Sequence, residues 1–96
     1  MKNVTKVTQM SSQRTGEAVK NQFKIYTPDG VYFQSYDTVI AFRSNSGKIQ
    51  LDKGMWDYST TTGKYRNMFL GEERKETEKK IASGVYELVD LNDGRE

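Results

Sequence analysis

The chain has 96 residues, of which 34% are hydrophobic and 29% are charged, and its formal net charge is +2. This length fits one domain with a modest core, and the charge balance is not that of a disordered chain. The chain contains no cysteine and no histidine, which excludes disulfides, zinc sites of the usual Cys/His kinds, and catalytic arrangements that need an imidazole or a thiol. We therefore predict a protein that is not an enzyme, with no catalytic residue, no metal site and no cofactor.

The charges are distributed unevenly along the chain. Residues 1–71 carry ten basic and five acidic side chains, whereas residues 86–96 carry one basic and four acidic side chains. A basic majority of this size suits a polyanionic partner, and it is equally ordinary for a solvated surface. No stretch is apolar enough for a signal peptide or a membrane span, so we expect a soluble cytoplasmic protein with no membrane partner.

The N-terminal part of the chain predicts a polar segment followed by a hairpin. Residues 1–16 are polar and suit an N-terminal arm or an edge strand, of which we favour the arm. In residues 22–36, apolar and polar side chains alternate on both sides of a turn at Pro28 and Gly30. Proline presets φ at the second turn position and glycine closes the turn. The pattern therefore predicts a β-hairpin over residues 22–36.

Two further strands are expected after the hairpin. Residues 38–43 are β-branched and apolar, which is typical of a buried central strand. Residues 44–47 have turn composition, and residues 48–51 alternate again. The pattern thus predicts an antiparallel β-meander of three to four strands.

The chemistry changes after Trp56, where helical patterns begin. A helix is expected over 61–70, because hydroxyl residues precede it as N-cap candidates and Gly71 follows as a C-cap. A second helix is expected over 72–83, with early acids and late lysines that match the helix macrodipole. Residues 85–91 then predict a final strand. The fold class is α+β: the meander, two short helices and a C-terminal strand.

These elements define one domain. We expect residues 17–92 to fold as a single α+β domain, preceded by the segment 1–16 and followed by a short tail at 93–96. An uncovered edge strand in such a sheet would allow a homodimer.

The start of the first predicted helix is the first candidate binding site. Free backbone N–H groups, hydroxyls and basic side chains could converge there on an anion such as a phosphate. A glycine in a first helical turn costs about 1 kcal/mol relative to alanine, which suggests close approach to the backbone. The alternative is that the hydroxyls only cap the helix and the bases are ordinary surface. The candidate nucleic-acid or anion-binding residues are Ser59, Thr60, Thr61, Thr62, Gly63, Lys64 and Arg66.

Aromatic side chains supply a second candidate surface. Rings among basic residues can stack on nucleic-acid bases, each worth about 1–3 kcal/mol. Alternation along residues 32–36 places Tyr32 and Tyr36 on one face of a strand and Phe33 on the other. One of these faces must be core, and core plus ordinary surface is the alternative interpretation. The candidate aromatic contact residues are Tyr32, Tyr36, Trp56 and Tyr58.

Four strings of the sequence resemble small proteins of unknown function encoded by tailed bacteriophages and prophages. The strings are NQF at 21–23, YFQSYDTVIAF at 32–42, WDYSTTTGKYRNMFLGE at 56–72 and DLN at 90–92. The resemblance implies an accessory protein made in the cytoplasm of an infected host cell, and it implies no assigned activity. Such proteins commonly bind nucleic acid or inhibit a host protein.

Two functions come first among those that the sequence leaves open, ahead of a structural component of the virion and, last, an enzyme. The first is binding of nucleic acid backbone at 59–66, with Lys64 and Arg66 on phosphates. The second is inhibition of a host or anti-phage defence protein, in the manner of an anti-CRISPR, through a sheet face or the acidic tail.

Overall fold

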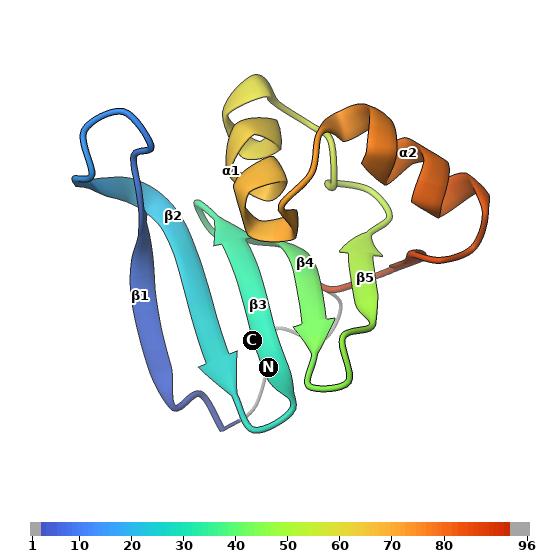
Figure 1. Ribbon diagram of the computed structural model, residues 1–96. Coiled ribbons are helices and arrows are strands. Elements are labelled where there is room, and N and C mark those ends of the chain that lie inside the picture. Colours follow the sequence, from blue (N-terminus) through green and yellow to red (C-terminus); the bar gives the residue numbers. More distant parts are fainter. Residues whose placement is uncertain (1–2, 93–96) are drawn as a thin grey trace.

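A six-stranded sheet with two helices on one face forms the fold in the computed structural model, which describes residues 3–92 (Figure 1). The strands lie side by side in chain order, and all neighbours are antiparallel except the last pair, β5 and β6. The elements are β1 (Lys6–Ser11), β2 (Ala18–Thr27), β3 (Gly30–Ser35), β4 (Thr38–Ser44), β5 (Ile49–Asp52), α1 (Thr60–Leu70), α2 (Arg74–Ala82) and β6 (Glu87–Val89).

The α+β class and the element order are confirmed, but the meander is longer than predicted. Five consecutive strands form it, because residues 6–11 of the expected arm are strand β1, paired with β2 at the sheet edge. Residues 1–2 of that segment and the expected tail at 93–96 lie outside the described residues. Neither helix within residues 3–92 has the length and hydrophobicity needed to cross a bilayer.

The C-terminal strand joins the sheet in parallel because the two helices carry the chain back across it. After β6, the side chain of Asn92 forms hydrogen bonds with both the N–H and the carbonyl of Val39, at 2.9 and 3.0 Å. The buried carboxylate of Asp52 accepts from the Leu91 N–H and the Asn92 amide, at 2.8 and 3.0 Å. These bonds extend the sheet edge beyond the end of β5.

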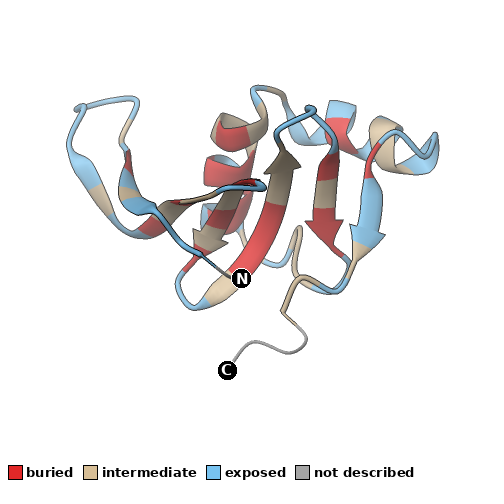
Figure 2. Ribbon diagram, turned by 90° about the horizontal axis from the view of Figure 1, so that it is seen from below, coloured by how far each residue is buried: buried red, intermediate tan, exposed pale blue. Residues whose placement is uncertain are grey.

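The core lies between the sheet and the helices. Both helices cover the same face of the sheet (Figure 2). Phe33, Ala41 and Leu51, which are fully buried, project toward this side from three neighbouring strands. The ring of Phe33 stacks on that of Phe69 from α1, with centroids 5.8 Å apart. Large rings let a domain of this size exclude water with few residues.

The opposite face of the sheet carries no helix within residues 3–92 (Figure 2). Tyr32 lies on this face, and Phe33 lies on the core face, as the alternation of the strand predicts. Tyr36 does not share a strand face with Tyr32, because it is in the β3–β4 turn, at a positive φ of 57°. We call the helix-free side the open face.

Glycine is required at the start of β3. Gly30 has a φ of +153°, and a Cβ at this position would lie 2.2 Å from the carbonyl oxygen of Arg43 on β4. The expected turn at 27–30 is present, with Thr27 paired to Gly30. The tight contact across the strands explains why the residue after Asp29 has no side chain.

We expect Gly30→Ala to destabilise the domain by about 3 kcal/mol or more, because it adds a steric clash to an unfavourable φ. Gly47→Ala is the matched control, since Gly47 has a φ of +91° with no atom within 4 Å of an added Cβ, and its cost should be about 1 kcal/mol. Urea unfolding measures both free energies. Equal losses would contradict the steric explanation.

Candidate functional site

The predicted anion-binding segment forms the loop before α1 and the first turns of that helix. Ser59 has extended backbone angles (φ −152°, ψ 161°), and its hydroxyl accepts a hydrogen bond from the Thr62 N–H at 3.1 Å. Ser59 is therefore the N-cap of α1, as its residue type predicts. Its hydroxyl already has a donor, which leaves the N–H groups of the first turn as the remaining candidates for an anion.

The candidate residues divide into buried and exposed sets. Thr62 is fully buried, and its hydroxyl lies 2.9 Å from that of Ser35 on β3. Gly63 is also buried, and an added Cβ would meet the Arg66 guanidinium at 3.6 Å, an ordinary contact. Thr60, Thr61 and Lys64 are exposed. The helix start therefore presents two hydroxyls and one amine to solvent.

Arg66 is a structural residue. Only 1% of it is exposed, and its guanidinium donates to the Trp56 carbonyl at 2.7 Å, to Asp57 at 3.1 Å and to Asn67 at 3.0 Å. It also lies 5.1 Å from the centroid of the Trp56 ring. The Nε of Arg66 is buried without a partner, but both terminal nitrogens are bonded to protein oxygens. A guanidinium this buried cannot reach a phosphate without breaking these bonds, so we leave Arg66 out of the binding proposal.

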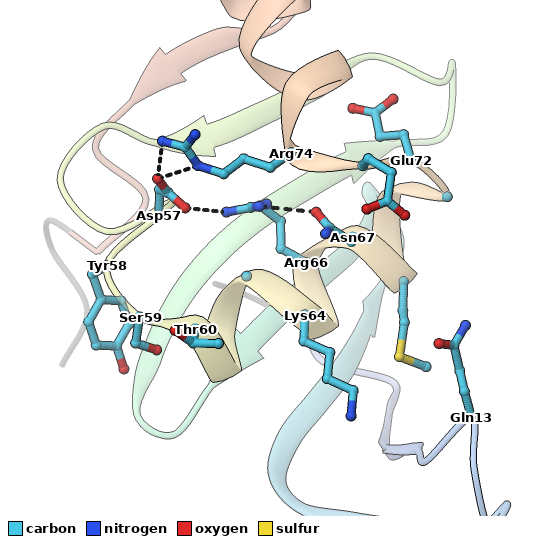
Figure 3. A pocket seen from close by; sticks show the side chains of 14 residues that line it. Gln13, Asp57, Tyr58, Ser59, Thr60, Lys64, Arg66, Asn67, Glu72 and Arg74 are labelled. Atoms are coloured by element: carbon cyan, nitrogen blue, oxygen red, sulfur yellow. Dashed lines mark hydrogen bonds and ion pairs between the residues drawn. The ribbon is translucent and has the colours of Figure 1, made fainter.

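Asp57 joins the two helices through a pair of arginines. We call Asp57, Arg66 and Arg74 the Asp57 cluster. It accepts from Arg66 on α1 and from Arg74 at the start of α2, the latter at 2.7 and 2.6 Å (Figure 3). Arg74 lies over the same Trp56 ring as Arg66, 5.8 Å from the centroid. The hydrogen bonds from Arg74, joined by those from Arg66, hold the pKa of Asp57 below its usual range.

Glu72, between the helices, is the centre of a second cluster. One carboxylate oxygen accepts from Lys80 at 2.7 Å and from the Tyr86 hydroxyl at 2.9 Å, and the other accepts from Thr77 at 2.6 Å. Burial alone would raise the pKa of Glu72, but these hydrogen bonds outweigh burial and lower it. Glu72 thus lies outside α2, which begins at Arg74, two residues later than expected.

The four candidate aromatic residues do not form one surface. Tyr32 lies on the open face, whereas Trp56 is half-buried beneath the two arginines. Tyr36 and Tyr58 are 48% and 45% exposed, in the β3–β4 turn and in the loop before α1. Of these rings, Tyr32 has an aromatic neighbour beside it on the sheet, Phe42, with centroids 4.4 Å apart.

Three lysines are on the helix side of the sheet, two on the first two strands and one on α1. Lys6 and Lys24 belong to the register rows that contain Val31 and Phe33, so their side chains point to the side that α1 occupies. Lys64 extends from α1 away from the Asp57 cluster (Figure 3). We call Lys6, Lys24 and Lys64 the basic surface; within residues 3–92 none of them forms an ion pair with a carboxylate.

The β1–β2 hairpin adds positive charge around this surface. It also carries Arg14 and Lys20, and Glu17 is its single acidic residue. An open hollow lies between Gln13 in the hairpin loop, Lys64 on α1 and the segment that joins the helices; its lining also includes the carboxylates Asp57, Glu72 and Glu73. The excess of bases in residues 1–36 was visible in the sequence, but the sequence could not show that Lys6 and Lys24 point to the side of the sheet that α1 occupies.

The acidic residues do not form a metal site in the part of the chain that the structure describes. Asp52 holds the chain after β6, and Asp57 holds the two arginines. Asp37 lies in the β3–β4 turn.

The carboxylates of Asp57 and Glu72 make the stability of the fold depend on pH. Because the folded-state pKa values of Asp57 and Glu72 are lowered, the unfolded chain binds more protons at low pH. Their contribution is therefore complete above the unfolded carboxyl range, about pH 4, and is lost as the pH falls below it. Melting temperatures of the wild type and of Asp57→Asn/Glu72→Gln between pH 7 and pH 3 should converge toward low pH. A difference that does not change with pH would contradict this.

Removal of Arg66 should cost about 3 kcal/mol, because it leaves the Trp56 carbonyl without its donor and Asp57 without its buried partner. Lys64→Ala, two residues earlier on the same helix and exposed, should change stability by less than about 0.5 kcal/mol. Urea unfolding of Arg66→Ala and Lys64→Ala tests the two roles. Near-wild-type stability of Arg66→Ala would show that the guanidinium is free for another use.

Comparison with known proteins identifies a family. The model of a family of unknown function, DUF8033, matches residues 5–84, so the chain belongs to that family. The match runs from just before β1 through α2 and includes the basic surface, the Asp57 cluster and the start of α1. No curated protein and no solved structure matches the chain.

Proposed function

We propose that this member of the family acts by contact and not by catalysis, and that it binds the phosphate backbone of a nucleic acid through the basic surface. The observation that carries the proposal is the pairing state of the cations. Arg66, Arg74 and Lys80 are held by carboxylates, whereas Lys6, Lys24 and Lys64 have no carboxylate partner within residues 3–92. Lysine amines of this kind are available to replace the counterions of a polyanion.

The distribution of charge across the sheet also supports nucleic-acid binding at the basic surface. The basic hairpin is at one edge of the sheet, and Glu87 and Asp90 are at or just beyond the opposite edge, formed by β6. A polyanion is attracted to the first edge and repelled from the second, so the field of the protein would orient it before contact. Thr60, Thr61 and the free N–H groups at the start of α1 lie near Lys64 and can donate to the same backbone.

The setting of this activity comes from the resemblance to phage proteins. We place the protein in the cytoplasm of an infected bacterium, as an accessory protein that acts on nucleic acid there. The proposal differs from the expectation drawn from the sequence in two respects. The contacts come from β1, β2 and α1 together, and Arg66 is a buried structural residue that makes no contact with the nucleic acid.

Inhibition of a host or defence protein is the second candidate, and the open face favours it. A sheet face that bears Tyr32 and Phe42 in contact has the aromatic character of a protein interface. The two functions differ in their response to salt, because apolar contacts release few counterions.

The test is an electrophoretic mobility shift series with single- and double-stranded DNA and RNA at two salt concentrations. Affinity should fall steeply with salt, and Lys6→Glu/Lys64→Glu should weaken binding about tenfold or more at low salt. Lys75→Glu/Lys79→Glu on exposed positions of α2 is the matched control, since it changes the net charge equally.

Two outcomes would reject the proposal. The absence of any shift at low salt would exclude nucleic-acid binding and leave the protein target. Equal losses in the two double variants would show that binding follows net charge and does not use the basic surface.

A further inference from the structure

The turn between β3 and β4 departs from the residue preference of its type. Ser35 pairs with Thr38, so Tyr36 and Asp37 are the two residues of the hairpin loop. A two-residue hairpin loop needs a positive φ at its first position, where glycine, asparagine and aspartate are preferred. Tyr36 occupies this position with a φ of 57°. A bulky side chain is unfavourable there, because its Cβ crowds the neighbouring backbone.

Asn21, which lies next to this turn, is the kind of residue that such a conformation favours. Its φ is 67°, and its carbonyl accepts a hydrogen bond from the Tyr36 N–H at 2.6 Å. Asparagine tolerates a positive φ, because its short polar side chain can bond locally. The carbonyl of Tyr36 accepts a second hydrogen bond from the Gln34 amide at 2.8 Å. The surrounding structure thus holds the turn in place although Tyr36 is unfavourable in it.

The ring of Tyr36 has no role in the core that would explain its presence. Tyr36 is 48% exposed and is not part of the core cluster. Within residues 3–92 its hydroxyl forms no hydrogen bond and its ring stacks on no other ring. Residues that a fold keeps in unfavourable backbone conformations cluster at ligand-binding and active sites. The side chain of Tyr36 is therefore a candidate for contact with a partner.

We propose that Tyr36 stacks on an unpaired base, and that the nucleic acid bound at the basic surface is therefore single-stranded. This inference rests on the proposed function and adds the kind of strand to it. Lysines bind phosphates of paired and unpaired strands alike. An aromatic ring can stack on a base only where that base is not enclosed in a duplex.

A second exposed ring lies at the same end of the sheet. The hydroxyl of Ser35, the residue before Tyr36, is 2.9 Å from that of Thr62. The Thr62 N–H donates to Ser59, the residue after Tyr58, at 3.1 Å. Tyr58 is 45% exposed and lies beside Ser59 at the start of α1 (Figure 3). The two tyrosines therefore flank the place where α1 meets β3, and both can contact bases of one strand.

The turn is close to the basic surface. Lys24 pairs with Phe33, which is three residues before Tyr36, or about 10 Å along an extended strand. Lys64 extends from α1, whose first turn contacts the end of β3. The turn has no cation, and its second residue is Asp37, so the contact at the turn is with a base and not with a phosphate. A single strand can thus place its phosphates at the lysines and a base on Tyr36.

Tyr36→Asn tests the inference, and Tyr36→Phe is the matched control. Asparagine removes the unfavourable φ, so we expect the melting temperature to rise by about 4 °C. The same variant should bind a single-stranded oligothymidine of about 16 nucleotides about tenfold more weakly, because it lacks the ring. Its binding to a duplex of equal length should not change. Phenylalanine keeps the ring and the φ, so Tyr36→Phe should match the wild type in thermal melting and in fluorescence anisotropy with both labelled probes.

The two measurements separate a contact residue from a packing residue. A melting temperature of Tyr36→Asn that does not rise would show that the ring is kept for the fold and would overturn the inference. An unchanged affinity for the single strand, or an equal loss on the duplex, would overturn it as well. Wild-type protein that binds neither probe at low salt would reject the proposed function and this inference with it. Binding that depends on Lys64 but not on Tyr36 would reject the inference alone.

Discussion

The buried guanidinium of Arg66 is the interaction on which the helical half of the domain depends. It ties α1 to the preceding loop through the Trp56 carbonyl and to Asp57, and Asp57 binds Arg74 of α2. A buried charge is tolerated only when it is paired and hydrogen-bonded. The loop before α1 is thereby fixed to both helices, and α1 is in turn held on the sheet by the Phe33–Phe69 ring contact and the Ser35–Thr62 hydrogen bond.

This constraint separates the cations of the protein into two groups. One group forms ion pairs: Arg66 and Arg74 share Asp57, Arg74 also pairs with Glu78, and Lys80 pairs with Glu72. Those of the β1–β2 hairpin have no such partner within the described chain, and α1 adds Lys64 to them. A net charge of +2 does not reveal this division, because it depends on which cations the fold places beside a carboxylate.

The sheet gives the domain two surfaces of different chemistry. Its helix side combines the core over β3 to β5 with the lysines beyond the edge of α1. On β1 to β4, its open side carries Val7, Ile25, Tyr32 and Phe42 in one row without a charged side chain. This division follows from the alternation of strand side chains, which sends Lys24 and Ile25 to opposite faces. A domain of 96 residues can in this way present an electrostatic contact and an apolar contact that do not interfere.

The sequence by itself determined the α+β class, the hairpin turn before Gly30, a hydroxyl N-cap within residues 59–62 and the C-cap at Gly71, because these depend on local backbone chemistry; the structure identified Ser59 as the cap. It also predicted that Phe33 and Tyr32 face opposite sides. Only the tertiary structure decided that residues 6–11 form a strand, since edge pairing with β2 leaves little trace in a polar segment. It likewise decided that Arg66 is buried and Lys64 exposed: both are bases two residues apart on one helix, and burial depends on which long-range partners, here Trp56 and Asp57, the fold brings to each.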